Sequence, residues 1–76
     1  MEEAGEILVD ARGHRCPVPT LKLRRALASA PTGARVRLIA DDPMARIDVP
    51  HFAAQAGVSV AETDESHGAL VFVIVK

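Results

Sequence analysis

The apolar run that closes the chain constrains the fold more than any other feature. Residues 69–75 are Ala-Leu-Val-Phe-Val-Ile-Val, with no polar side chain among them. A short continuous run of this kind, rich in β-branched and aromatic residues, is typical of a strand that is buried on both faces. Such a strand needs a neighbour on each edge. We therefore expect a sheet in which residues 69–75 form an interior strand.

Three further segments have the patterns of strands: residues 6–10, 34–40 and 58–63. Residues 6–10 are a short β-type run. In the second segment Val36 and Leu38 would face one side of the sheet, and Arg35 and Arg37 the other. The third segment also alternates. Alternation indicates strands with one buried face and one solvated face.

Two segments between these strands have helical patterns. From Pro17 to about Ala30, one face is apolar and the opposite face carries Lys22, Arg25 and Ser29. The second helical segment ends at Ala56, before Gly57 as a C-cap. Asp42 is a candidate N-cap, with Pro43 at the first helical position. Because a proline interrupts helical hydrogen bonding, we expect a short turn over residues 43–47 and the main helix from Asp48, with Pro50 in its first turn.

The element order β-α-β-α-β-β predicts an α+β fold, a two-layer sandwich with a four-stranded mixed sheet and two helices on one face. The first two strands should be parallel and the last two antiparallel. The 76 residues are expected to form a single domain, 1–76. A domain of this size buries only roughly 60–65% of its unfolded surface. Any chemistry would therefore take place at the surface, with a partner protein completing the site.

The composition excludes several classes of protein. No apolar run reaches the roughly 20 residues that span a bilayer, and residues 1–5 are unlike a signal peptide. The net charge is -1, and Trp and Tyr are absent, which disfavours nucleic-acid binding by charge or stacking. A single unpaired cysteine fits a reducing compartment. We expect a cytoplasmic protein.

The only cysteine, Cys16, lies where a strand gives way to a helix. A lone thiol excludes an internal disulfide, a CxxC redox pair and a cysteine-rich zinc site. As the N-cap of the helix, Cys16 would be followed by Pro17 at the first position and Pro19 at the third, unless the helix begins one turn later. The prolines remove two amide donors, so we expect the Val18 N–H to remain free beside the sulfur.

The surroundings expected for this thiol favour its anion. A cysteine at a helix N-terminus near cationic groups has a lowered pKa, and the thiolate is its reactive form. Five of the nine Lys and Arg residues lie between residues 12 and 25: Arg12, Arg15, Lys22, Arg24 and Arg25. They predict a basic face around Cys16 that would steer an acidic partner toward the thiol. An ordinary solvated helix face would have the same pattern, and a buried, inert Cys16 is the competing interpretation.

Two other groups of polar residues have weaker signals. Asp41 and Asp42 either cap the second helix or offer paired carboxylates to a partner. His14, His51 and His67 lie far apart and have no metal-ligand spacing, so no metal site is predicted.

Two segments of the chain resemble the signature of the TusA/SirA sulfur-carrier family. Residues 8–19 contain an Asp, a Gly and a CPxP box that opens the first helix: Asp10, Gly13, Cys16, Pro17 and Pro19. Residues 41–43, followed by residues 48–50 and Phe52, resemble the second block of the family. The likeness extends over essentially the whole chain. Some relatives have a second cysteine where this chain has Ala53, which argues against an internal resolving thiol.

This resemblance implies a β-α-β-α-β-β sandwich and a persulfide carrier. A cysteine desulfurase would load sulfur onto Cys16, and the carrier would pass it to an acceptor protein, as in tRNA 2-thiouridine synthesis or molybdenum-cofactor assembly. The protein would be a sulfurtransferase-like relay, not a free-standing turnover enzyme, and a monomer that needs no cofactor. Pro17 and Pro19 match as positioning residues. Asp10, Gly13 and Asp42 also match the family pattern.

Two other functions remain open at this stage. A non-catalytic regulatory or RNA-binding module would use the basic residues of the first helix. A thiol redox sensor would use Cys16, although no resolving cysteine is present. The sequence does not choose among tRNA thiolation, molybdenum cofactor, sulfur oxidation and selenium metabolism.

Overall fold

Six elements follow one another along the chain in the predicted order. The structure is a computed structural model that describes residues 6–15, 18–65 and 68–76. The elements are β1 (Ile7–Asp10), α1 (Val18–Ser29), β2 (Arg35–Ala40), α2 (Ala45–Ala56), β3 (Ser59–Asp64) and β4 (Leu70–Val75). Their boundaries agree with the predicted ones to within one residue, apart from the start of α2.

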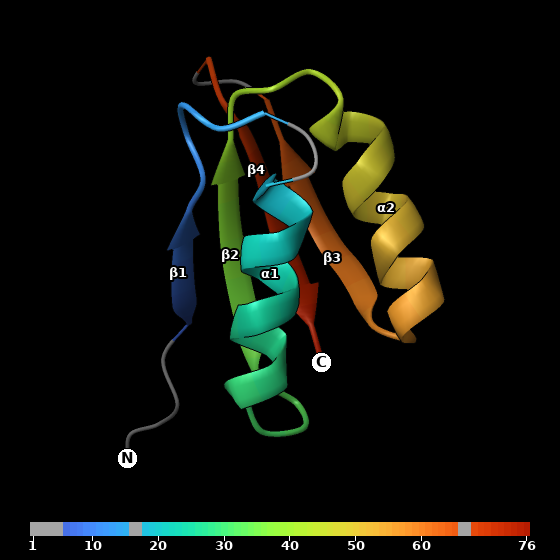
Figure 1. Cartoon of the computed structure of the whole chain (residues 1–76). Helices are drawn as coiled ribbons and strands as arrows, with labels where there is room; N and C mark the ends of the chain where they lie inside the picture. Colours follow the sequence, from blue (N-terminus) through green and yellow to red (C-terminus); the bar gives the residue numbers. More distant parts are fainter. Residues whose placement is uncertain (1–5, 16–17, 66–67) are drawn as a thin grey trace.

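The four strands form one mixed sheet in the order β1-β2-β4-β3. β1 and β2 are parallel, and β4 pairs antiparallel with both β2 and β3. Both helices cover the same face of this sheet (Figure 1). The predicted α+β sandwich is therefore confirmed, and so is the interior position of the closing apolar strand.

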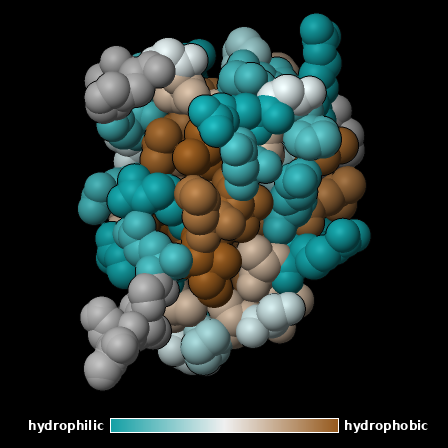
Figure 2. Space-filling view, turned by 90° about the vertical axis from the view of Figure 1, so that its left-hand side faces the viewer, coloured by the Kyte–Doolittle hydropathy of each residue, from teal (hydrophilic) through white to brown (hydrophobic). Residues whose placement is uncertain are grey.

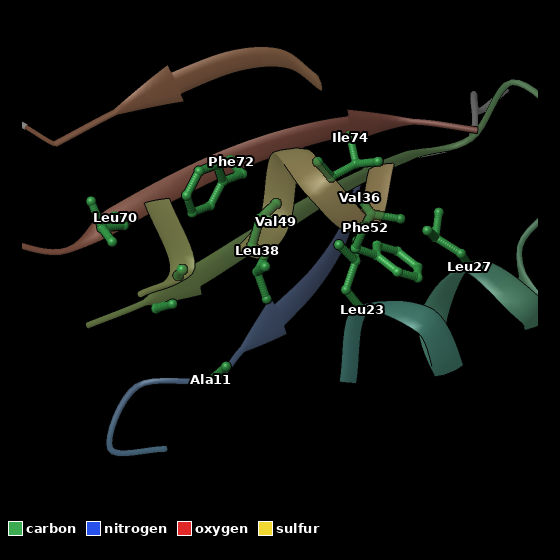
Figure 3. Packing of buried hydrophobic residues seen from close by; sticks show 12 residues of the cluster. Ala11, Leu23, Leu27, Val36, Leu38, Val49, Phe52, Leu70, Phe72 and Ile74 are labelled. Atoms are coloured by element: carbon green, nitrogen blue, oxygen red, sulfur yellow. The ribbon is translucent and has the colours of Figure 1, made fainter. Parts of the chain in front are cut away.

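The core lies between the sheet and the two helices. Phe72 and Ile74 of β4 point toward the helices and are almost completely buried. Leu23 of α1 and Val49 of α2 meet them from the other layer, and both are fully buried (Figure 3). Contact between these side chains removes the apolar faces of both layers from water, which is the main stabilising contribution to a small domain.

Charged side chains cover part of the opposite face of the sheet. Val73 points away from the helices, yet only 1% of it is exposed. Its neighbours across the sheet are Arg37 and Glu62. Arg37 donates to Glu6 at 2.8 Å, and an arginine held in this way lays its aliphatic stem along the sheet. The polar outer face predicted from the alternation in β2 therefore shields an interior valine.

The start of α2 differs from the prediction. The helix begins at Ala45, not at Asp48, and Pro50 lies beyond its first turn. The expected turn and the helix are continuous, because successive amides donate to the carbonyl three residues before them: Ala45 to Asp42 at 2.9 Å, Arg46 to Pro43 at 3.1 Å and Ile47 to Met44 at 3.0 Å. The proline leaves the Arg46 carbonyl without its helical donor, at an exposed position where water can replace it.

α2 ends at the predicted residue, Ala56, and α1 ends one residue before the predicted Ala30. Gly57 follows α2 with a φ of 75°, in the left-handed region that favours glycine. α1 ends at Ser29 and has no basic residue in its last turn. Instead, the Lys76 ammonium donates to the carbonyls of Leu27 and Ala30, at 2.7 and 2.6 Å. The end of β4 thus supplies the cation that the C-terminus of α1 lacks.

Replacing this cation should destabilise the domain. Lys76→Met keeps most of the aliphatic stem but removes the donor and the charge, so we expect the free energy of unfolding to fall by about 1 kcal/mol. Urea unfolding followed by circular dichroism measures the change. Lys22→Met, at the only other lysine of the chain, is the matched control and should change stability much less. Equal effects of the two substitutions would contradict the capping role of Lys76.

Candidate functional site

Two loops at one end of the sheet form the candidate site. Residues 11–15 follow β1, and residues 41–44 follow β2. Because β1 and β2 are parallel, both loops emerge at the carboxyl ends of their strands, beside the start of α1 (Figure 1). The carboxyl ends of parallel strands are a common position for functional sites in α/β folds.

Hydrogen bonds join the first loop to its neighbours. The Ala11 amide donates to the Ile39 carbonyl at 2.7 Å, and the Ala11 side chain is fully buried. The Gly13 amide donates to both carboxylate oxygens of Asp41, at 3.0 and 3.1 Å. Gly13 has a φ of 84°, a conformation that other residues adopt only with strain. The Gly13–Asp41 contact thus holds the two loops together.

Between the loops lies an open cavity of about 260 Å³. Its lining residues come from both loops: Gly13, His14, Arg15, Asp41, Asp42 and Pro43. Arg15 is the residue that precedes Cys16 in the chain, and it is exposed. Cys16 and Pro17, the expected thiol and the first expected positioning proline, lie outside the described residues.

The start of α1 corrects one expectation. The Val18 amide is not free, because it donates to the Arg15 carbonyl at 2.9 Å. A bond from the amide of one residue to the carbonyl three residues earlier is the hydrogen bond of a turn, so the Val18 amide is already engaged where α1 begins. Pro19 is buried in the first turn of α1, which contains no acidic side chain. This end of the helix therefore retains the positive potential of its dipole.

Asp10 and Arg12 form an ion pair beside the site. The Arg12 guanidinium donates to both carboxylate oxygens of Asp10, at 3.0 and 2.8 Å, and the Arg12 amide donates to one of them at 3.1 Å. These hydrogen bonds, first of all those of the guanidinium, lower the pKa of Asp10 to about 2. Arg12, a predicted partner-binding residue, is paired with Asp10 within the chain, and its contact with a partner stays a prediction.

The basic residues of α1 do not form the single face that we expected. Lys22 and Arg25 line a groove next to β1. Arg24 points elsewhere, with its guanidinium carbon 5.6 Å from the centre of the Phe52 ring of α2. Successive residues of a helix are 100° apart, so Arg24 and Arg25 cannot share one narrow face. The basic residues of α1 therefore lie on at least two different surfaces of the protein.

The two aspartates have separate structural roles. Asp41 accepts the Gly13 amide, as described above. Asp42 Oδ1 accepts the Met44 amide at 3.1 Å, which is the hydrogen bond of an aspartate that caps a turn, while Met44, the N-cap residue of α2, makes no side-chain capping bond. The predicted capping role of Asp42 thus holds for the turn that precedes α2 and not for the first turn of the helix, and contact of either carboxylate with a partner stays a prediction.

Sequence reasoning missed several residues that shape this site. His14 and Pro43 line the cavity, and Ala11 anchors the first loop. Within the described ranges, no three His, Cys, Asp or Glu side chains are grouped as metal ligands. Their position in the site is not a local property of the sequence, because the cavity forms only where the loops after β1 and β2 meet.

The ion pair beside the site makes a measurable prediction. A folded-state pKa below the ordinary value of 3.8 means that folding favours ionised Asp10, so its contribution to stability is present above about pH 4 and is lost as the pH falls through about 2. An NMR titration of the Asp10 carboxyl carbon should give a pKa of about 2. In Arg12→Gln the pKa should return toward 3.8. A carboxyl that titrates at the same pH in both proteins would contradict the pairing.

Comparison with known proteins identifies the family. Residues 7–76 match the family model described as sulfurtransferase TusA. The chain is 30% identical to the sulfur carrier protein TusA of Pseudomonas aeruginosa over 76 residues, covering 100% of this chain and 96% of that protein. It is 35% identical to the sulfur carrier protein TusA of Allochromatium vinosum over 68 residues, with 90% of each chain covered.

A solved structure has the same fold. The crystal structure of a SirA-like protein from Desulfitobacterium hafniense superposes with a TM-score of 0.80 and 30% sequence identity, covering 91% of this chain and 95% of that one. No helix in the described part of the chain is long and apolar enough to cross a membrane. Sequence and fold agree, and the chain belongs to the TusA family of sulfur carrier proteins.

Proposed function

We propose that this protein carries sulfur as a persulfide on Cys16. It receives the sulfur from a cysteine desulfurase and passes it to an acceptor protein, as in tRNA 2-thiouridine or molybdenum-cofactor pathways. The observation that carries the proposal is the family membership of a chain whose only thiol lies two residues before the first residue of α1. We place the relay in the cytoplasm, where a single unpaired thiol remains reduced.

The transfer requires no net oxidation or reduction. The Cys16 thiolate attacks the outer sulfur of the donor persulfide, forms a new S–S bond and breaks the S–S bond of the donor, which leaves as a thiolate. The outer sulfur of Cys16 then releases its proton to solvent. In the second transfer an acceptor thiolate attacks that outer sulfur, and the Cys16 thiolate leaves. Because all the sulfur chemistry is thiol exchange, the carrier itself uses no cofactor.

Arg15 is the cation best placed to stabilise the anionic sulfur. It is exposed, it precedes Cys16, and no described carboxylate pairs with its guanidinium. Arg12 differs, because Asp10 occupies its guanidinium. The N-terminus of α1 adds positive potential without an acidic residue in its first turn. The Val18 amide, which donates to Arg15, has no part in this stabilisation.

The other residues of the family pattern position the loop that leads to Cys16. Gly13 adopts the left-handed conformation that lets its amide reach Asp41. Pro19 is buried in the first turn of α1 and fixes the start of the helix. We assign Pro17 the same positioning role from its place in the CPxP box. Lys22, Arg24 and Arg25 remain candidates for contacts with the donor and acceptor proteins.

The alternative of a regulatory or RNA-binding module has less support. That function would use one continuous basic surface on α1, whereas Lys22 and Arg25 lie toward β1 and Arg24 lies over Phe52. Arg12 is neutralised by Asp10. The charge left on any one surface is small, and nucleic-acid affinity falls with the number of phosphate contacts.

Sulfur loading tests the proposal directly. Incubation with a cysteine desulfurase and free cysteine should add the mass of one sulfur atom to the protein, and a reducing agent should remove it. Intact-mass spectrometry measures both changes. Cys16→Ala should gain no sulfur. Loading of the alanine variant to the same extent, or no loading of the wild-type protein, would refute a persulfide on Cys16.

Arg15 and Arg12 provide a matched pair of variants. Arg15→Gln removes the cation that we assign to the anionic sulfur, so loading in single-turnover experiments should slow by about fivefold to tenfold. Arg12→Gln removes the same charge from a guanidinium that is already paired with Asp10, and loading should slow less. Equal slowing of both variants would show that only the overall charge near the site matters.

A further inference from the structure

The outer edge of β1 has no strand beside it among the residues that the structure describes. The sheet order β1-β2-β4-β3 leaves β1 and β3 at the edges, and no described strand pairs with their outer sides. β3 has the usual protection of an edge, with a register shift between Val60 and Glu62 and acidic side chains. β1 has neither a bulge nor a proline, and Ile7 to Val9 are all apolar.

The backbone groups that face outward on β1 follow from its pairing with β2. The amide of Ala11 points toward β2, because it donates to the Ile39 carbonyl. Alternate residues of a strand direct their N–H and C=O groups to the same edge, so Ile7 and Val9 also face β2. Leu8 and Asp10 therefore direct their N–H and C=O groups outward, where an added strand would find two donors and two acceptors.

A groove lies alongside this edge, between β1 and α1. Its volume is about 440 Å³, and its lining residues are Ile7, Leu8, Val9, Asp10, Lys22, Arg25, Ala26 and Ser29. Ala26 and Ser29 have small side chains, which leave room beside the strand. Leu8 borders the groove at the strand edge, but its side chain alternates with those of Ile7 and Val9 and so points to the opposite face of the sheet, where the residue is 62% exposed. Viewed from the side of β1, an apolar stripe runs down the molecule between hydrophilic residues (Figure 2).

The charged side chains that line the groove indicate which kind of partner it would bind. Lys22 and Arg25 bring two cations to its α1 side. The one carboxylate among the lining residues, that of Asp10, is already paired with Arg12. If a second copy of this chain paired antiparallel through its own β1, its Lys22 and Arg25 would lie near Lys22 and Arg25 of the first copy. Charge complementarity therefore favours an acidic partner over a second copy.

We propose that the β1 edge is a docking site for an extended segment of a partner protein, in which acidic side chains alternate with apolar ones. The segment would add a fifth strand next to β1. Its acidic side chains would enter the groove beside Lys22 and Arg25, and its apolar side chains would lie next to Leu8, because successive residues of a strand point to opposite faces. This docking site does not depend on the sulfur chemistry of Cys16.

NMR titration tests the proposal. The probe is a blocked seven-residue peptide in which glutamate alternates with valine, added to the ¹⁵N-labelled full chain. The amide signals of Leu8 and Asp10 should shift to saturation, and their hydrogen exchange should slow at least about tenfold at saturation. Raising the salt concentration should weaken binding. The same peptide with lysine in place of glutamate, or with a central proline, should bind at least about threefold more weakly.

Variants of neighbouring arginines provide a matched control. Arg25→Glu reverses a charge in the groove and should weaken peptide binding at least about threefold. Arg24→Glu makes the same change one residue away, on the Phe52 side of α1, and should weaken it less. Leu8→Pro removes an outward amide without removing a bond to β2, so it should abolish binding. If the proline variant does not fold, the comparison of Arg25→Glu with Arg24→Glu tests the docking site.

Several outcomes would overturn the docking site. They are no saturable shift of the Leu8 and Asp10 amides at millimolar peptide, equal binding of the lysine peptide, and equal effects of the two arginine variants. Shifts of the same amides on dilution without peptide would assign the edge to a second copy. Shifts caused by a uridine oligonucleotide would assign it to nucleic acid. Sulfur loading of Cys16, measured separately by mass, does not enter this decision, so the two proposals can fail independently.

Discussion

The burial of β4 between β2 and β3 is the constraint on which the rest of the structure depends. Phe72 and Ile74 point into the core, and Val73 is buried on the opposite face. A strand that is buried on both faces must be paired on both edges, because its backbone groups have no access to water. β2 and β3 supply these pairs, and β1 is left at the edge. The layered fold and its exposed strand both follow from this one strand.

The same arrangement explains why the candidate site lies at the end of the sheet. With 76 residues the core is filled by side chains of both layers, and the cavities are open to the surface. The loops after β1 and β2 meet at the start of α1, where the Gly13–Asp41 contact joins them. A cavity formed by such loops is open to solvent, as the proposed transfer of sulfur between two partner proteins would require.

Sequence reasoning predicted the helices and strands well, because the spacing of apolar residues indicates which face of each element is buried. The predicted start of α2 was wrong. The sequence pattern of residues 43–47 does not show that the hydrogen bonds of this turn continue into those of the helix. Prediction of the site was less complete. The expected free amide of Val18 is engaged by Arg15, and the expected basic face is divided between two sides of α1. Residue type alone suggested these site residues, whereas their contacts depend on side-chain directions that sequence spacing does not contain.

The sequence by itself determined the element order, the layered fold class and the single cysteine before α1, because apolar periodicity and residue type are local properties. Only the tertiary structure decided which basic side chains near the site are already engaged by other residues of the chain. Arg12 is paired with Asp10, Arg24 lies over Phe52, and Arg15 faces the cavity. It also decided that β1 lies at an edge of the sheet, where no described strand pairs with its outer side. These facts depend on which distant segments become neighbours, and packing sets that arrangement for the whole chain at once.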